Sequence, residues 1–282
     1  MTFGGILTAM VTPFSENGEL DEAATAALVR HLLANGSDGL VLAGSTGEGS
    51  TLDDEEKLRL WQIGLAEAGG APIIANTGSN DTRHSVELTQ RATELGVDGV
   101  LAVTPYYNKP NRRGLIEHFR AVAGATELPV IVYNVPSRCV IDLPNDLLAE
   151  LAETENIVAV KQSRYEHIEP IEGLDLLAGN DDTLAEVLDA GGTGGICVAS
   201  NVAGPEVRRM IDEPENRQEI HDSLADLFAA LSVTANPIPV KAALEMIGHR
   251  VGGLRLPLVA ASEHERAVVR ASLEKHGLLA AV

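Results

Sequence analysis

Lys161 is the first candidate for chemistry because of the residues that precede it. It ends the apolar run IVAVK (157–161), and the side-chain period of two in a strand places it on the same face as Ala159 and Ile157. Burial in an apolar environment lowers the pKa of a lysine from ~10.4 and frees its lone pair to attack a ketone. Taken alone, a lysine at a strand end is more often solvated or salt-bridged, so other motifs must decide its role.

Hydroxyl groups follow other apolar runs. The phenol of Tyr133 ends such a run and can exchange protons with a carbonyl carbon or oxygen, although a core aromatic with a satisfied hydroxyl is the alternative. Tyr106 and Tyr107 also follow a run, so three of the four tyrosines in the chain occupy such positions. Ser45 and Thr46 lie in the glycine-flanked turn GSTGE (44–48), whose hydroxyls and backbone amides suit a carboxylate.

These polar groups follow a repeated unit of one apolar run and one helix-period stretch. Continuous apolar character, rather than strict alternation, is what strands covered on both faces show. Eight runs occur, at residues 6–14, 39–48, 72–79, 99–105, 129–136, 157–163, 174–181 and 194–201. Helix signals follow these runs. Apolar residues recur at helical spacing over residues 20–33, with Asp21 at the start, and a cap with first-turn acids occurs at residues 51–54.

Eight such units predict the α/β class and a (β/α)8 TIM barrel, in which active sites form at the C-terminal ends of the strands. A doubly wound open sheet is the rival, but the phosphate-binding glycine fingerprint expected after its first strand is absent from the sequence. Helical patterns replace the strand rhythm after about residue 217. We therefore expect a barrel catalytic domain over residues 1–217 and a small C-terminal helical domain over 218–282.

The charge balance excludes some partners. The chain has 21 basic and 41 acidic residues and a net charge of -20, which argues against binding to nucleic acid or to an anionic membrane. Scattered acids and few lysines are typical of halophilic proteins, with an acidic enzyme from a mesophile that prefers arginine as the alternative. No window approaches the ~18 apolar residues of a membrane span, and no basic segment precedes an apolar stretch at the start, so we expect a cytoplasmic protein.

The chain has two cysteines, Cys139 and Cys197, without a second Cys or His at ligand spacing. This pattern predicts reduced packing residues and neither a disulfide framework nor a zinc site. No cluster of His, Asp and Glu at ligand spacing points to another metal.

Several motifs together resemble the dihydrodipicolinate synthase and N-acetylneuraminate lyase family over nearly the whole chain. The motifs are TPF (12–14), GSTGE (44–48), TPYYNKP (104–110), YNVPSR (133–138), Lys161, GND (179–181), residues 191–200 and NPIPVK (236–241). The resemblance implies a covalent imine between pyruvate and Lys161 and no metal or organic cofactor. The residues that it assigns to catalysis are Lys161, Tyr133, Ser45 and Tyr107, and those that it assigns to substrate binding are Thr46, Arg138, Ile196, Gly179 and Asn180.

In this scheme Tyr133 donates and accepts protons, and Thr46 and the Ile196 backbone hold the pyruvate end. Ser45 and Tyr107 complete a proton relay, with Tyr107 reaching in from a partner subunit of a homotetramer built as a dimer of dimers. The implied reaction condenses pyruvate with L-aspartate 4-semialdehyde to 4-hydroxy-tetrahydrodipicolinate, toward diaminopimelate and lysine. The alternatives are a 2-keto-3-deoxygluconate-type aldolase and, more distantly, a non-catalytic sugar-acid-binding barrel.

Arg138 bears on that choice, because an arginine there binds substrate carboxylate in the synthase-like relatives. The competing interpretation is a surface arginine paired with an acid such as Asp142. Two positions depart from the family pattern, since Ser45 stands where threonine is usual and Gln162 stands where glutamate is common. We expect Ser45 to keep the relay hydroxyl with a less restricted rotamer, and Gln162 to remove a charge near the imine.

The resemblance also bears on feedback inhibition by lysine. Asn80 and Tyr106 match the residues that bind lysine in sensitive relatives, but His84 stands in place of a glutamate and Lys57 in place of a histidine. A cationic ligand would lose its carboxylate partner and meet a repelling ammonium, so we expect little inhibition.

Overall fold

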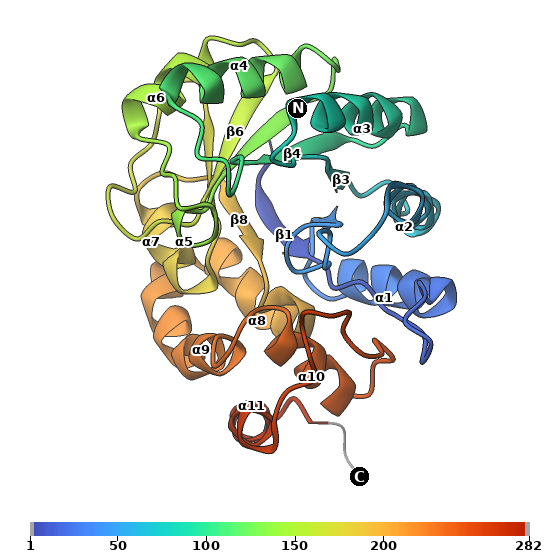
Figure 1. Ribbon diagram of the computed structural model, residues 1–282. Coiled ribbons are helices and arrows are strands. Elements are labelled where there is room, and N and C mark those ends of the chain that lie inside the picture. Colours follow the sequence, from blue (N-terminus) through green and yellow to red (C-terminus); the bar gives the residue numbers. More distant parts are fainter. Residues whose placement is uncertain (1–2, 280–282) are drawn as a thin grey trace.

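Eight parallel strands close into a barrel in the computed structural model, which describes residues 3–279 (Figure 1). Each strand pairs with the next, and β8 pairs with β1. The strands are β1 Gly5–Ala9, β2 Gly39–Leu42, β3 Ile73–Asn76, β4 Gly99–Val103, β5 Val130–Asn134, β6 Ile157–Gln162, β7 Asp175–Ala178 and β8 Gly194–Cys197. Seven lie wholly within the predicted runs and β1 starts one residue early, so the barrel prediction is confirmed. Tyr133 and Lys161 lie among the last residues of β5 and β6, whereas the polar turn of residues 44–48 lies in the loop beyond β2.

Helices surround the strands (Figure 1). They are α1 Glu22–Ala34, α2 Asp54–Glu67, α3 Thr82–Leu95, α4 Arg112–Ala123, α5 Pro136–Cys139, α6 Asn145–Ala152, α7 Leu184–Asp189, α8 Ser200–Asp212, α9 Arg217–Leu231, α10 Ile238–Met246 and α11 Glu263–Lys275, with 3-10 turns η1 Asp181–Thr183 and η2 Pro214–Asn216. Both predicted caps form. Asp21 accepts from the Ala24 amide at 3.0 Å, and Asp53 forms a capping box with Glu56.

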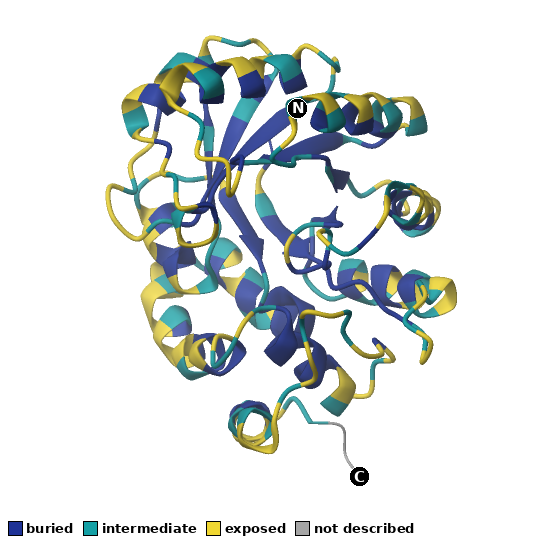
Figure 2. Ribbon diagram, viewed as in Figure 1, coloured by how far each residue is buried: buried dark blue, intermediate teal, exposed yellow. Residues whose placement is uncertain are grey.

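The strands are buried on both faces, as their dark colour in Figure 2 shows. One face of each strand fills the barrel interior, and the other packs under the surrounding helices. The interior layer includes Leu7, Val41, Ile74, Leu101, Ile131, Ala159, Leu177 and Ile196. Burial on both sides accounts for the continuous apolar runs.

An irregularity in β6 corrects one prediction from the sequence. Ala159 faces the barrel interior with Lys161, but Ile157 packs in the outer layer under the helices. The register between β5 and β6 shifts at this point, because Val130 pairs with Ile157 whereas Ile131 pairs with Ala159. One extra residue in β6 breaks the period of two, so the prediction that Ile157 shares a face with Lys161 is wrong.

The C-terminal part is helical, as predicted. Helix α10 packs against α8, α9 and α11, and α9 also packs against η1 at the end of β7. These helices therefore touch the rim of the barrel. The boundary between residues 217 and 218 coincides with the first turn of α9 and stays a prediction. No helix within residues 3–279 is both long and apolar enough to cross a membrane.

Both cysteines are buried and free, which confirms their assignment as reduced residues. Burial raises the pKa of the Cys139 thiol to about 11, although the charge of Arg138 opposes the shift. Burial also raises the pKa of Cys197, and the nearby Asp181 carboxylate adds to the shift. Both thiols therefore stay protonated and unreactive at neutral pH.

Candidate active site

A cavity of about 200 Å³ lies at the C-terminal ends of the strands. All but two of the residues predicted for the site line it. Those that line it are Ser45, Thr46, Tyr133, Arg138, Lys161, Gly179 and Asn180. Tyr107 and Ile196 are not in the lining. Tyr107 is 87% exposed, and Ile196 is fully buried in β8.

Lys161 and Tyr133 are direct neighbours across β5 and β6. The Lys161 Nζ lies 4.4 Å from the centroid of the Tyr133 ring, and both residues are 6% exposed. Among the residues that the structure describes, no carboxylate lies within ion-pair distance of Lys161. The amine is therefore held in the cavity beside a phenol and without an acidic partner.

The other lysines lie in different surroundings. Lys57 pairs with Asp54, Lys241 with Glu48 and Lys275 with Asp226, and Lys109 is exposed outside the cavity. Within residues 3–279, Lys161 is thus the one buried lysine without a carboxylate partner.

The turn that carries Ser45 and Thr46 is tightly constrained. Ala43 and Glu48 adopt left-handed backbone conformations, with φ of 56° and 53°. A Cβ on Gly49 would lie 1.9 Å from the Ala43 carbonyl oxygen, so only glycine fits there. The Thr12 hydroxyl donates to the Gly47 carbonyl at 2.6 Å. Such strain persists only where the surroundings hold the backbone in place.

A buried ion pair from the C-terminal part supports this turn. Lys241 Nζ lies 2.7 Å from Glu48 Oε1 and donates to the Gly253 carbonyl at 2.7 Å, while the Arg255 amide donates to Glu48 Oε2 at 2.9 Å. The Phe14 ring lies 4.3 Å from the Lys241 ammonium and 4.4 Å from the Arg255 guanidinium. Burial lowers the pKa of Lys241, and the Glu48 carboxylate offsets part of that shift.

Asn236 links two of the predicted substrate-binding residues. Its side-chain amide donates to the Thr46 hydroxyl at 2.9 Å, and its backbone carbonyl accepts from Arg138 Nη2 at 3.3 Å. The sequence places Asn236 in the NPIPVK motif but gives it no role. Its contacts could not be predicted, because about 190 residues separate it from Thr46.

Arg138 has no acidic partner among the described residues. The acid proposed for the competing interpretation, Asp142, pairs instead with Arg164 at 3.0 Å and accepts from Asn134 at 2.7 Å. The competing interpretation, in which Arg138 pairs with an acid such as Asp142, therefore does not describe the structure. In a chain with 41 acidic residues, a cavity-lining guanidinium without a carboxylate is available to an anionic ligand.

Gln162 does not line the cavity that contains Lys161. Its Oε1 accepts from the buried side-chain amide of Asn134 at 2.9 Å and from the Arg164 amide at 3.3 Å. Because consecutive strand residues point to opposite faces, Gln162 belongs to the outer layer. Gln162 in place of glutamate therefore removes a charge from the outer layer, beside Asn134 and Arg164, rather than from the cavity itself.

Several cavity residues have no role in the sequence-based assignment. Tyr165 follows β6, so the fourth tyrosine also lies beyond a strand end, and this signal could have identified it. Asp182 follows β7 directly after the GND motif. The remaining ones are Val135, Ser137, Asp181, Val198, Asn236 and three residues of α9 and its end, Phe228, Leu231 and Ser232.

Asp181 is held by the backbone beyond β8. Its carboxylate accepts from the Val198 amide at 2.9 Å and from the Ala199 amide at 3.1 Å. Burial raises the pKa of Asp181 to about 6, although these amides and the charge of Lys161 oppose the shift. Asp181 thus positions the segment that closes the cavity beside β8.

A second cavity, of about 600 Å³, adjoins the first and shares Tyr133 and Arg138 with it. It is lined by Asp54, Lys57, Asn80, His84 and Tyr106, among others. His84 takes the place of the expected glutamate, but the cavity still contains carboxylates, among them that of Asp54. The Asp54 carboxylate already has two partners within the chain, His84 and Lys57.

His84 Nε2 lies 2.9 Å from Asp54, and Lys57 Nζ lies 3.7 Å from it. Burial alone would raise the pKa of Asp54, but the hydrogen bond from His84 and the nearby positive charges lower it overall. The carboxylate therefore stays ionised and is already neutralised from within the chain.

Metal ligands are not gathered anywhere in the described part of the chain. Within residues 3–279 no three His, Cys, Asp or Glu side chains come together as a metal site requires. That the reaction proceeds without a metal stays a prediction.

The sequence matches the dihydrodipicolinate synthetase family over residues 2–276. It is 45% identical over 290 residues to a Desulforudis audaxviator protein named 4-hydroxy-tetrahydrodipicolinate synthase, with 98% of this chain and 99% of that protein covered. DHDPS from Cyanidioschyzon merolae, solved with lysine bound, has a TM-score of 0.96 at 40% identity, with 98% of this chain and 99% of that chain covered. Dihydrodipicolinate synthase from Acinetobacter baumannii, complexed with pyruvate, has a TM-score of 0.95 at 37% identity, with 99% of this chain and 100% of that chain covered. This chain therefore belongs to the dihydrodipicolinate synthetase family.

Proposed function

We propose that the protein condenses pyruvate with L-aspartate 4-semialdehyde to 4-hydroxy-tetrahydrodipicolinate, the step that leads toward diaminopimelate and lysine. The observation that carries the proposal is the pairing of a buried, acid-free Lys161 with Tyr133 in a cavity that Arg138 also lines. The names of relatives that match the whole chain support the same reaction.

In the proposed mechanism the neutral amine of Lys161 attacks the keto carbon of pyruvate and water leaves, which gives an imine. The imine withdraws electrons from the pyruvate methyl group, which loses a proton and attacks the aldehyde carbon. The amino group of the condensed product then displaces Lys161 and closes the ring. The imine is the electron sink, so this route needs no metal and no organic cofactor.

Tyr133 is the proposed proton donor and acceptor, because its side chain lies against Lys161. Thr46, which is buried and accepts from the Asn236 side chain, is proposed to hold the pyruvate carboxylate together with the Ile196 backbone. Gly179 and Asn180, which line the cavity, are proposed to bind substrate as well. Ser45 lines both cavities and supplies the relay hydroxyl.

Tyr107 would complete the relay from a partner subunit of a homotetramer. Its side chain is 87% exposed, and its left-handed backbone, with φ of 73°, turns at the tip of the segment after β4. Such an exposed aromatic residue suits a subunit contact. We infer in addition a cytoplasmic location and, from the net charge of -20, adaptation to high salt.

Replacement of Arg138 tests the identity of the aldehyde. Arg138→Lys, and more strongly Arg138→Ala, are expected to lower kcat/KM for aspartate semialdehyde by at least about tenfold, or ~1.4 kcal/mol. The reason is that the guanidinium binds a carboxylate through two parallel hydrogen bonds, which an ammonium cannot reproduce. Imine formation with pyruvate is expected to persist in both variants. A coupled assay with each aldehyde, and borohydride trapping, measure the two effects.

The matched control is Arg113→Ala, because Arg113 is exposed on α4 and lines neither cavity. Unchanged efficiency of both Arg138 variants, or a preference of the wild type for glyceraldehyde, would replace the proposal by the 2-keto-3-deoxygluconate-type aldolase.

Free lysine is expected to inhibit the enzyme weakly. Lysine would have to compete with His84 and Lys57 for the Asp54 carboxylate, and Lys57 would repel its side-chain ammonium. Activity measured with increasing lysine should therefore stay near its starting value through the sub-millimolar range. Lys57→Ala, which removes the repelling charge, is expected to bind lysine more tightly than the wild type. Strong inhibition of the wild type below 1 mM, or no gain in the variant, contradicts this account.

A further inference from the structure

The rim of the smaller cavity carries one unpaired base and one unpaired acid. Arg138 is the base, as described above. Asp182 is the acid, since no lysine, arginine or histidine within residues 3–279 lies within ion-pair distance of its carboxylate. Both side chains are exposed at the mouth of the same cavity of about 200 Å³. A ligand that reaches both therefore meets a positive and a negative group at once.

Tyr165 holds the Asp182 carboxylate at this rim. Its hydroxyl donates to Asp182 Oδ2 at 3.3 Å, and the distance to Oδ1 is 3.5 Å. Burial and the negative charge of Asp182 raise the pKa of the Tyr165 phenol, so the hydroxyl remains a donor at neutral pH. A single neutral donor leaves the charge of Asp182 uncompensated and most of its acceptor positions free.

The adjacent acid cannot take the same role. The Asp181 carboxylate is occupied by the amides of Val198 and Ala199 and is fixed in the cavity wall. Asp182 is therefore the acid that remains open to a ligand on this side of the cavity.

We propose that Asp182, held by Tyr165, binds the α-ammonium group of the aldehyde substrate while Arg138 binds its α-carboxylate. The inference rests on the proposed function and makes Asp182 a specificity-determining residue of the same site. Aspartate semialdehyde carries both charges on one carbon, whereas a sugar-derived aldehyde such as glyceraldehyde carries neither. An acid and a base facing one cavity thus select an amino-acid aldehyde over a hydroxyaldehyde.

Succinate semialdehyde separates the two contacts, because it has the same carbon skeleton and carboxylate but lacks the ammonium group. For Asp182→Asn we expect kcat/KM with aspartate semialdehyde to fall by roughly three- to tenfold, a modest loss because the carboxylate is exposed to water. The inhibition constant of succinate semialdehyde, measured in competition with aspartate semialdehyde, should change by less than about twofold. Asp182→Glu should recover part of the loss, since it restores the charge.

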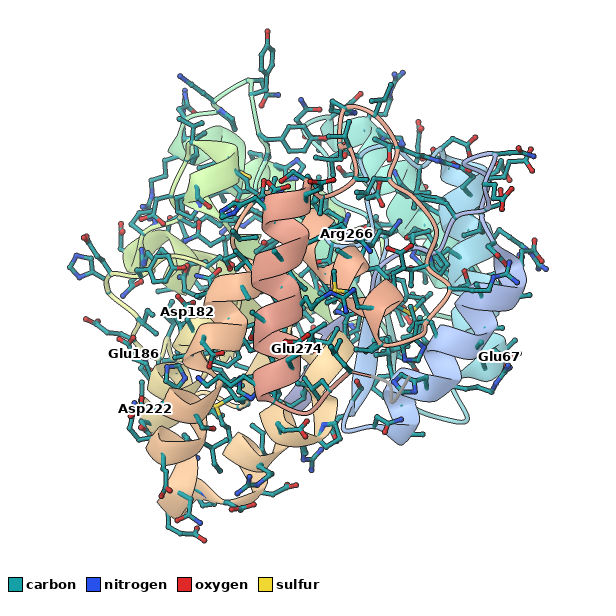
Figure 3. All side chains as sticks on the ribbon, turned by 90° about the horizontal axis from the view of Figure 1, so that it is seen from below. Glu67, Asp182, Glu186, Asp222, Arg266 and Glu274 are labelled. Carbon is teal, nitrogen blue, oxygen red and sulfur yellow. The ribbon has the colours of Figure 1, made fainter. Side chains whose placement is uncertain are left out.

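Two variants serve as comparisons. Glu186→Gln removes an exposed acid that lies on the same side of the molecule but does not line the cavity (Figure 3). This variant should leave kcat/KM for aspartate semialdehyde and the inhibition constant of succinate semialdehyde unchanged. Arg138→Ala should weaken the binding of both aldehydes, because both carry the carboxylate. This pattern distinguishes loss of the ammonium contact from a general change of the site.

Equal effects of Asp182→Asn on the two aldehydes, or no effect on either, would overturn the assignment of Asp182 and leave the proposed reaction standing. Failure of the wild type to condense pyruvate with aspartate semialdehyde, despite forming the imine at Lys161, would instead remove the proposed function and this inference with it.

Discussion

Borohydride reduction in the presence of pyruvate is expected to attach a pyruvate-derived group to Lys161 and to no other lysine. Trapping requires an amine that is both free of a carboxylate and inside the cavity. Lys57, Lys241 and Lys275 each have an acidic partner, and Lys109 is exposed outside the cavity. Peptide mass mapping of the reduced protein locates the adduct.

Lys161→Arg should abolish trapping and lower turnover by roughly 10⁴-fold or more, because a guanidinium stays protonated and cannot form the imine. The variant should keep its circular dichroism spectrum, because the substitution changes one side chain at the cavity and leaves the packed layers of the barrel intact. Lys109→Arg is the matched control and should trap pyruvate as the wild type does. An adduct on Lys241 or Lys109, or turnover by Lys161→Arg near the wild-type rate, would contradict the imine mechanism.

Loss of the buried lysine in the C-terminal part is expected to have the largest effect on stability. Lys241→Met leaves the Glu48 carboxylate, which is 2% exposed, without its cationic partner. An unpaired buried charge costs about 3–5 kcal/mol, so the free energy of unfolding measured in urea should fall by that amount. The turn that carries Ser45 and Thr46 should also lose its order, and activity should fall with it.

The double variant Glu48→Gln with Lys241→Met should recover much of this loss, because it removes the charge and keeps an oxygen to accept from the Arg255 amide. Lys275→Met breaks the exposed pair with Asp226 and should cost no more than about 1 kcal/mol. A double variant as unstable as the single one would show that lost packing, rather than unpaired charge, explains the effect.

The barrel itself could be predicted from the sequence because its physical cause is local. Strands buried on both faces require continuous apolar runs, and eight such runs are visible in the chain. The face that each strand residue occupies could be predicted only where the period of two is unbroken. Ile157 was misplaced because the extra residue in β6 depends on pairing with β5, about 27 residues away, which the sequence does not display.

The site residues, too, could be predicted only where their position follows from the local sequence. Lys161, Tyr133 and Arg138 lie at or just beyond strand ends, where the barrel gathers them whatever their partners. Asn236 and Phe228 come from the C-terminal helical part, whose position on the rim depends on tertiary packing. Asp54 was missed because its role follows from its distance to His84. The roles of Tyr107 and Ile196, and the homotetramer, stay predictions.

Closure of the barrel has a consequence for synthesis of the protein. Strand β1 is bonded on one side to β2 and on the other to β8, Gly194–Cys197. A ribosome adds about 5–20 residues per second, so roughly 10–40 s pass between translation of the first strand and of the last. During that time β1 keeps one free backbone edge, which can pair with strands of other nascent chains. Aggregation during translation should therefore be greatest before β8 emerges, and binding by a chaperone during that interval would protect the chain.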